Sequence, residues 1–215
     1  MMSIKANIGC GTTPTEGWLN FDNSPAIKLA KSPLRYKLAR ALGLLNKQQI
    51  ENIEWNKVNN IQYADATKSI PLETSSVDCI YTSHMVEHLS QEGAKSFLVE
   101  AKRVLKAGGI VRIAVPDLKI AVDEYLKSND ADAFMKGILV KAPEINTLKQ
   151  KINLFVSGYR HHQWLYDGNS LAKLLLEMDF KSVEICKNGK TNIIEPDALD
   201  LYEREEQSVY VEAIN

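Results

Sequence analysis

The sequence predicts a single α/β domain with a doubly wound, mostly parallel sheet. Short apolar strands alternate with amphipathic helical patterns through residue 116, which is typical of this architecture. The stretch 110–116 (Ile-Val-Arg-Ile-Ala-Val-Pro) is almost continuously apolar, as expected of a central parallel strand covered on both faces. A chain of 215 residues is long enough to form one such domain with its own core. We therefore treat residues 1–215 as one domain.

Composition narrows the class of protein. The net charge of -1 provides no general attraction to nucleic acid or to anionic membranes. No apolar run approaches the roughly 20 residues that span a bilayer, so membrane insertion is not expected. The chain enters a strand almost at once, which argues against a signal peptide. Cys10, Cys79 and Cys186 lie in or beside predicted strands, so we expect them to be reduced and buried in a cytoplasmic protein.

The most informative stretch is a strand at 4–10 that runs into the turn Gly9-Cys10-Gly11. Glycine allows backbone N–H groups to approach a ligand closely, because no Cβ stands in the way. The next strand, 18–22, ends on Asp22, where a carboxylate is placed to accept hydrogen bonds from ribose hydroxyls. Together these features predict an adenosine-containing ligand. The link at 12–17 is too short for a crossover helix, which is a departure from the usual dinucleotide pattern.

Further elements follow from hydrophobic periodicity. The predicted strands after the second are 60–65, 77–83, 110–116, 181–187 and 208–214, and the predicted helices are 33–45, 91–105 and 168–178, with two or three more between 118 and about 156. The glycines of 106–109 are expected to close the helix at 91–105.

The helix at 33–45 has one apolar and one basic side. We expect the apolar side to pack on the sheet and the basic side to face solvent, with a lid or a surface for an acidic substrate as the alternative. The apolar side consists of Leu34, Leu38, Ala41, Leu42 and Leu45.

By residue 109 the pattern resembles a class I S-adenosylmethionine-dependent methyltransferase. The segments that carry the resemblance are Asn7–Gly11, Asp22, Asp65, Val77–Tyr81 with Glu87–Leu89, and Arg103–Gly109. The sequence looks most like a small bacterial group that reads Gly-Trp-Leu-Asn-x-Asp in its second strand.

The resemblance implies a Rossmann-like sheet ordered 3-2-1-4-5-7-6 with strand 7 antiparallel. It also implies S-adenosylmethionine as cofactor, lying across the carboxyl ends of the first two strands. The implied cofactor-binding residues are Asn7, Gly9, Cys10 and Gly11 at the methionine part, Asp22 at the ribose, Asp65 and Ala66 at the adenine, and Ser83 and His84 beside the methyl donor. The short link at 12–17 removes the helix N-terminus that would otherwise hold the methionine carboxylate.

The acceptor side is predicted around the polar and aromatic segment 159–167. We expect His161 or His162, together with His84, to orient the acceptor or act as a base, and segments 26–56 and 118–158 to form a helical cover. In the alternative interpretation, this segment is a surface loop whose Trp164 fills the core. The acceptor is expected to be a small molecule, with a sugar or cell-surface precursor suggested by the resemblance alone. The sequence does not predict the oligomeric state.

Three other functions compete with this interpretation. The stretch from His84 to His88 matches the His-x-x-Glu-His pattern of some zinc hydrolases. No third ligand is evident from the sequence, so no metal is expected. A nicotinamide-dependent oxidoreductase fits poorly, since the glycine turn lacks its third small residue. A relic that binds the cofactor without turnover is the other alternative, because no catalytic base is obvious.

Nucleic acid is not expected as the acceptor. Amino-methylating enzymes of this kind carry Asp/Asn/Ser-Pro-Pro-aromatic after the fourth strand, where this chain has Thr82–Met85.

Overall fold

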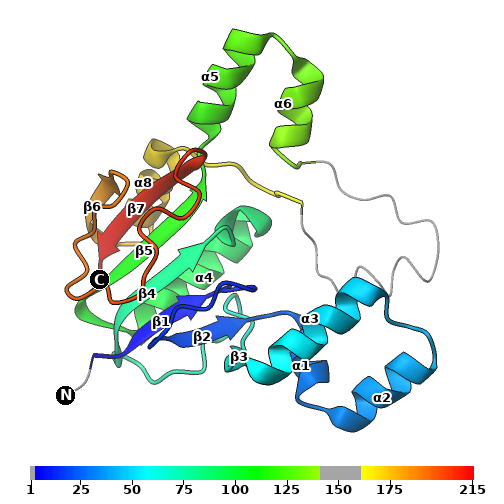
Figure 1. Cartoon of the computed structure of the whole chain (residues 1–215). Coiled ribbons are helices and arrows are strands. Elements are labelled where there is room, and N and C mark those ends of the chain that lie inside the picture. The colour runs from blue at the N-terminus through cyan, green and yellow to red at the C-terminus, as the bar shows by residue number, and fades with distance from the viewer. Residues whose placement is uncertain (1–2, 141–160) are drawn as a thin grey trace.

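The computed structural model describes residues 3–140 and 161–215. Its centre is a seven-stranded sheet in the order β3-β2-β1-β4-β5-β7-β6 (Figure 1). The strands are β1 (Lys5–Ile8), β2 (Leu19–Asp22), β3 (Ile61–Tyr63), β4 (Val77–Ser83), β5 (Leu105–Pro116), β6 (Lys181–Cys186) and β7 (Ser208–Ile214). Strand β7 runs antiparallel to both β5 and β6, and the pairs among β1 to β5 are parallel. The predicted fold class and strand order are therefore confirmed.

The helices begin at recognisable caps. Ser90 caps α4 by accepting a hydrogen bond from the backbone of Gly93, and Asp167 forms a capping box with Ser170 at the start of α8. The helices are α1 (Pro25–Ala30), α2 (Pro33–Ala41), α3 (Lys47–Val58), the 3₁₀ turn η1 (Val86–His88), α4 (Gln91–Val104), α5 (Leu118–Ser128), α6 (Ala131–Gly137) and α8 (Gly168–Glu177). Among the described helices, none combines the length and apolarity needed to cross a bilayer.

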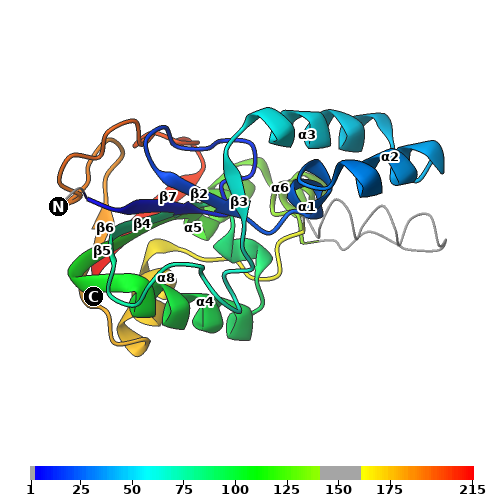
Figure 2. The ribbon, with the colours of Figure 1, turned by 90° about the horizontal axis from the view of Figure 1, so that it is seen from below.

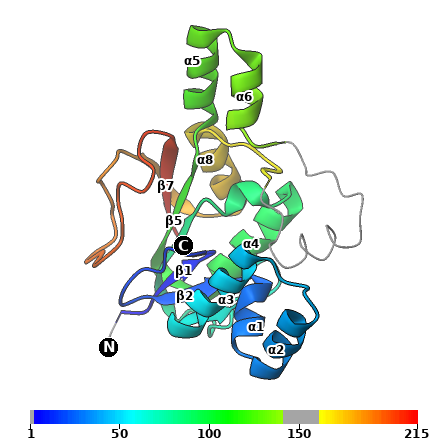
Figure 3. The same ribbon diagram turned by 45° about the vertical axis from the view of Figure 1, so that its right-hand side comes forward.

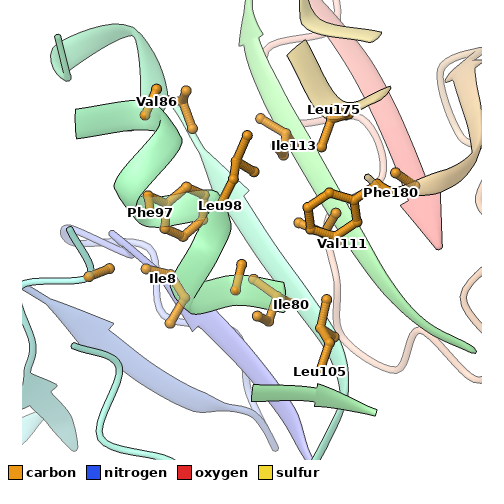
Figure 4. Packing of buried hydrophobic residues seen from close by; sticks show 14 of the residues in the cluster. Ile8, Ile80, Val86, Phe97, Leu98, Leu105, Val111, Ile113, Leu175 and Phe180 are labelled. Carbon is orange, nitrogen blue, oxygen red and sulfur yellow. The ribbon is translucent and has the colours of Figure 1, made fainter. Parts of the chain in front are cut away.

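The main core lies between one face of the sheet and helices α4 and α8 (Figures 2 and 4). Phe97 and Leu98 of α4 project toward Ile80 of β4, and Leu175 of α8 lies near Ile113 of β5. All five side chains are essentially inaccessible to solvent. Because α4 spaces its apolar residues at helical intervals, one side of it is buried and its charged residues remain outside.

The opposite face is covered mainly by an irregular segment, residues 187–207. Cys79 and Tyr81 point to this face, since side chains alternate along β4 and Ile80 belongs to the other one. The second cluster consists of Trp18, Cys79, Tyr81, Ala114, Cys186, Ile193, Leu199 and Tyr210. All three cysteines are buried and free, in agreement with the prediction.

A buried ion pair fixes this segment to the sheet. Nη1 of Arg112 in β5 lies 2.7 Å from Oε1 of Glu212 in β7, and both side chains are buried. Nη1 also donates to the Lys190 carbonyl at 2.9 Å. The Glu212 carboxylate accepts two further hydrogen bonds, from the Thr191 hydroxyl at 2.6 Å and the Asn192 backbone at 2.7 Å. One carboxylate thus organises both strands and the segment that covers them.

The prediction for 33–45 was wrong in its packing. Helix α2 ends at Ala41, and the side predicted to be buried is exposed: 80% of Leu34, 59% of Leu38 and 62% of Leu42 is accessible. The buried residue is Tyr36, whose hydroxyl donates to Glu54 of α3 at 2.6 Å. The helix therefore packs through Tyr36 on its neighbours α1 and α3, and not on the sheet.

The expected glycine cap after the helix at 91–105 was also wrong. Strand β5 starts at Leu105, directly after α4, and Gly108 lies within it at φ 79°. The last carbonyls of α4 instead accept hydrogen bonds from the backbone of Ser75 and Ser76. With these groups satisfied, the helix needs no glycine at its end.

Helices α5 and α6 agree with the prediction of helices after residue 118, and the part of that prediction covering 141–158 lies outside the described residues. The helix at 168–178 is confirmed as α8.

Replacing Glu212 by alanine should lower the free energy of unfolding by about 3–5 kcal/mol, because Arg112 would be left as an uncompensated buried charge. Chemical denaturation monitored by circular dichroism measures the loss. Glu177→Ala is the matched control: its partner Lys173 is 3.9 Å away and both side chains are exposed, so the change should stay below about 1 kcal/mol. Equal losses in the two variants would contradict the assigned role of the buried pair.

Candidate functional site

The glycine turn after β1 is held against β2 by backbone hydrogen bonds. The N–H groups of Gly9 and Cys10 both donate to the Phe21 carbonyl, at 2.8 and 3.1 Å. Gly9 and Gly11 have φ values of 73° and 54°, in the left-handed region that favours glycine. A Cβ on Gly9 would lie 2.5 Å from the Met85 side chain, whereas a Cβ on Gly11 would face open space. Gly11 therefore leaves room for a ligand at the sheet edge.

Two asparagines hold the short β1–β2 link in place of a crossover helix. Asn7 donates from Nδ2 to the Thr15 hydroxyl at 3.0 Å and to the Thr13 carbonyl at 3.3 Å. Asn20 accepts from the Thr15 backbone N–H at 2.8 Å and donates to the Thr15 and Trp18 carbonyls. The Asn7 amide, predicted from resemblance as a cofactor contact, is thus engaged inside the link.

Asp22 joins the ends of β1 and β2. Its Oδ2 accepts from the Gly11 backbone N–H at 3.0 Å, and its Oδ1 accepts from the Ser24 N–H at 2.7 Å. Burial raises the pKa of this carboxyl, and the two backbone hydrogen bonds partly oppose that rise. Each oxygen retains a second lone pair. The group can therefore shape the turn and still accept hydrogen bonds from a vicinal diol such as ribose.

Asp65, after β3, is used locally. Oδ1 accepts from the Thr67 hydroxyl at 2.7 Å, and Oδ2 lies 2.8 Å from the Lys68 ammonium. Partial burial raises the pKa of Asp65, but the hydrogen bonds from Lys68 and Thr67 prevail and hold it below its usual value. Ala66 is buried in the main core. The adenine contact predicted for Asp65 would compete with these local partners.

These observations fit an adenosine-containing cofactor. Open space at Gly11, a left-handed turn without Cβ atoms and a partly available carboxylate at Asp22 lie together at the carboxyl ends of β1 and β2. Acceptor oxygens at this position suit hydroxyl donors of a ribose.

His84 follows β4 in a left-handed conformation, with φ 49°. Its N–H donates to the Ala114 carbonyl of β5 at 2.9 Å, so the conformation is fixed by the sheet. Nε2 of the ring lies 3.0 Å from the Ser208 hydroxyl, and Nδ1 lies 3.3 Å from Oε1 of Glu87. A histidine in this region is uncommon, and the strain has to be offset by surrounding contacts.

Glu87 is the centre of a histidine cluster. Its side chain is 1% exposed, and neither carboxylate oxygen accepts a hydrogen bond from the described residues. Oε1 is 4.0 Å from Nε2 of His88. The rings of His88 and His162 are 5.1 Å apart, and the possible metal-binding atoms of Glu87, His88 and His162 all lie within 4.8 Å of one another.

The segment after residue 160 is tied to this cluster through its backbone. The N–H groups of Gln163 and Trp164 both donate to the Glu87 carbonyl, at 2.8 and 3.2 Å. The His161 carbonyl lies 3.1 Å from Nδ1 of His88. Trp164 is 43% exposed, so the alternative in which it fills the core was wrong. The segment instead positions His162 and contributes a carbonyl from His161.

The charge of Glu87 affects its neighbours. Burial lowers the pKa of His162, although Glu87 pulls it upward. Burial and the Glu87 charge together raise the pKa of Tyr166 to about 12. His84 and His162, both predicted as catalytic, are therefore brought to one carboxylate, and Glu87, His88 and Tyr166 were missed as site residues. The His-x-x-Glu-His spacing was the signal for the first two.

Comparisons with known proteins agree with this arrangement. A family model described as a methyltransferase domain matches residues 6–113. No curated protein sequence matches the chain.

Solved structures share the fold at low identity. One is an S-adenosylmethionine-dependent methyltransferase from Thermotoga maritima, described as a possible histamine N-methyltransferase, at 14% identity and a TM-score of 0.50, covering 100% of this chain and 83% of that one. A second is DhpI in a complex described as DhpI-SAM-HEP, at 8% identity and a TM-score of 0.52, covering 99% and 78%. A third, from Methanosarcina mazei, has 12% identity and a TM-score of 0.51, covering 100% and 94%.

The matched region runs from β1 through most of β5 and contains the glycine turn, Asp22, Asp65 and the His84–His88 segment. It accounts for half of the chain and for the sheet edge described above. The chain therefore belongs to the methyltransferase domain family.

Proposed function

We propose that the protein transfers a methyl group to a small-molecule acceptor bound over the carboxyl ends of β4 and β5. The observation that carries this proposal is the position of Met85. Its side chain lies against Gly9 of the cofactor turn, while His84, just before it in the chain, and Glu87, two residues after it, belong to the histidine cluster. The proposed acceptor site and the proposed cofactor site therefore share the short segment around η1.

For the cofactor side, we propose that Asp22 accepts from the ribose hydroxyls and that Gly9, Cys10 and Gly11 pass under the methionine part. Asp65 and Ala66 would border the adenine, and Ser83 and His84 the methyl donor. Asn7 would contribute indirectly, since its amide holds the link beside the turn. S-adenosylmethionine supplies a methyl group already activated on a sulfonium centre.

The protein side chains would orient the acceptor and accept the proton that it loses. A hydroxyl acceptor loses its proton as the methyl bond forms, so a nearby base such as a neutral imidazole would assist the transfer. We propose that His84 or His162 takes that proton. Glu87, 3.3 Å from Nδ1 of His84, would stabilise the resulting imidazolium. His161 would act through its backbone carbonyl on His88.

Further parts of the proposal concern the helices that enclose the acceptor, the identity of the acceptor and the location of the protein. Figure 3 shows α5 and α6 as a hairpin standing beyond the end of β5, with α1 to α3 beside β2 and β3. We propose that the segments 26–56 and 118–158 enclose the acceptor, which suits a small ligand better than nucleic acid. We further propose that the acceptor is a sugar or cell-surface precursor and that the protein is cytoplasmic. We also propose that it belongs to the bacterial group that reads Gly-Trp-Leu-Asn-x-Asp in its second strand.

Asp22→Ala should weaken S-adenosylmethionine binding by roughly 1–3 kcal/mol, because buried hydrogen-bond partners lose their acceptor. Asp65→Ala should weaken it less, since its carboxylate is already shared with Thr67 and Lys68. Isothermal titration measures both. Unchanged affinity in Asp22→Ala would refute the ribose assignment, and a folded Asp65→Ala protein without cofactor binding would reverse the ranking.

The two glycines form a second matched pair. Gly11→Ala should cost about 1–2 kcal/mol of stability, for the left-handed backbone alone, and should weaken cofactor binding because the methyl group enters the open space. Gly9→Ala should cost about 1–3 kcal/mol more, because its Cβ collides with Met85. Thermal unfolding and cofactor titration separate these effects. If Gly11→Ala binds the cofactor as well as the parent protein, the ligand does not pass this residue.

His84→Ala and His162→Ala should each lower turnover by about 100-fold or more while cofactor affinity is retained. The readout is release of the demethylated cofactor against a metabolite extract, which also serves to find the acceptor. His161→Ala should have a smaller effect, since the carbonyl on which His88 depends is preserved. Turnover only with intact protein or nucleic acid would rule out the enclosed small-molecule site.

A further inference from the structure

We propose that Glu87, His88 and His162 form a binding site for a divalent transition-metal ion, with Zn²⁺ as the best match. The sequence alone predicts no metal, because no third ligand for His84 and His88 is evident from it. In the structure the third ligand is His162, which lies 74 residues beyond His88 in the sequence. The possible ligand atoms of Glu87, His88 and His162 all lie within 4.8 Å of one another. This inference concerns metal binding and holds whatever the methyl acceptor is; with the ion bound, His162 is a ligand and His84 is the imidazole left to take the acceptor's proton.

The first argument is the unmet demand of buried polar groups. Glu87 is 1% exposed and His162 is 6% exposed. Within the described residues, the two carboxylate oxygens of Glu87 have no hydrogen-bond partner, and Nδ1 of His162 has none either. Burying a carboxylate without hydrogen-bond partners is costly unless a cation compensates for it. A metal ion among these atoms would satisfy both side chains.

The second argument is the orientation of His88. Its Nδ1 lies 3.1 Å from the His161 carbonyl, which can only accept, so Nδ1 carries the proton. Nε2 is then the nitrogen with the free lone pair, and it is the atom on the Glu87 side, 4.0 Å from Oε1. Histidines that ligate metals characteristically donate their other N–H to a backbone carbonyl in this way.

The third argument is that the segments bearing the ligands are fixed to each other. The Glu87 carbonyl accepts from the N–H groups of Gln163 and Trp164, and the Gln163 side chain donates to the His88 carbonyl at 2.7 Å. Such backbone contacts hold His162 beside η1 before any ion is bound. A site with its ligands already in place loses little entropy on binding.

The donor set selects the class of ion. Two imidazoles and one carboxylate suit Zn²⁺ and other first-row transition metals, whereas Mg²⁺ and Ca²⁺ prefer oxygen ligands alone. Zinc bonds of about 2.0–2.2 Å place tetrahedral donors roughly 3.3–3.5 Å apart, so the Glu87–His88 separation of 4.0 Å needs a contraction of under 1 Å, and a pair at the 4.8 Å limit needs one of up to about 1.5 Å. Side-chain rotation can supply it. Three protein ligands leave a coordination position for water or for an oxygen of the acceptor.

The test is zinc titration of the full chain, freed of any affinity tag and treated with a chelator. Isothermal titration with ZnCl₂ should give one ion per chain, and Co²⁺ should give the visible absorption bands of a low-coordinate nitrogen and oxygen site. Glu87→Gln and His162→Asn should each weaken zinc binding at least tenfold and abolish the Co²⁺ bands. His161→Asn is the matched control and should leave both unchanged, because His161 is not among the candidate ligands and the substitution keeps its backbone carbonyl.

Two results would overturn the proposal. One is no zinc binding by the parent chain at micromolar concentration. The other is equal uptake by the parent chain and by the Glu87→Gln/His162→Asn double variant, which would assign the ion to surface groups. Circular dichroism and S-adenosylmethionine titration of each variant exclude misfolding as the cause of lost zinc binding. They also separate the two proposals, since cofactor binding with no zinc uptake refutes the metal site alone.

Discussion

The structure depends on how a very short connection joins β1 to β2. Parallel strands are normally linked by a crossover helix, and residues 9–18 are too few to form one. Hydrogen bonds replace the helix: the Gly9 and Cys10 N–H groups share the Phe21 carbonyl, and the Asp22 carboxylate binds the Gly11 N–H. The same carboxylate that is placed to meet a ribose therefore also closes the turn, so cofactor recognition and local folding rest on one side chain.

The two faces of the sheet are covered differently. One face is covered by α4 and α8, and the opposite face by α1 and α3 near β3 and by Trp18 and the irregular segment 187–207 elsewhere. An irregular segment cannot satisfy its own backbone groups as a helix does. The Glu212 carboxylate takes part of that role by accepting from the Asn192 backbone and the Thr191 hydroxyl as well as from Arg112. A buried charge thus substitutes for regular secondary structure.

Features set by local chemistry could be predicted from the sequence. The positions of most strands and the glycine turn follow from hydrophobic periodicity and the turn preference of glycine, whereas the strand order was predicted from the family resemblance. Packing between distant segments could not. The side of α2 that carries Leu34 is as apolar as a core-facing side, yet Tyr36 is what contacts α3. Likewise, no local pattern could reveal that His162 lies beside Glu87, since that proximity depends on backbone bonds between η1 and residues 163–164.

The two buried glutamates, Glu212 and Glu87, differ in whether hydrogen-bond donors satisfy their carboxylates. Glu212 accepts hydrogen bonds from Arg112, Thr191 and Asn192, so its role is complete within the fold. Glu87 is as deeply buried, but among the described residues none donates a hydrogen bond to it. The Glu212 carboxylate is met by three hydrogen-bond donors, whereas the Glu87 carboxylate is surrounded by imidazoles. The Glu87 carboxylate therefore needs a cation to compensate its charge. A protonated His84, with Nδ1 3.3 Å from Oε1 of Glu87, or a metal ion can meet that need, and His88 is oriented as a metal ligand would be, because its unprotonated Nε2 is the atom on the Glu87 side.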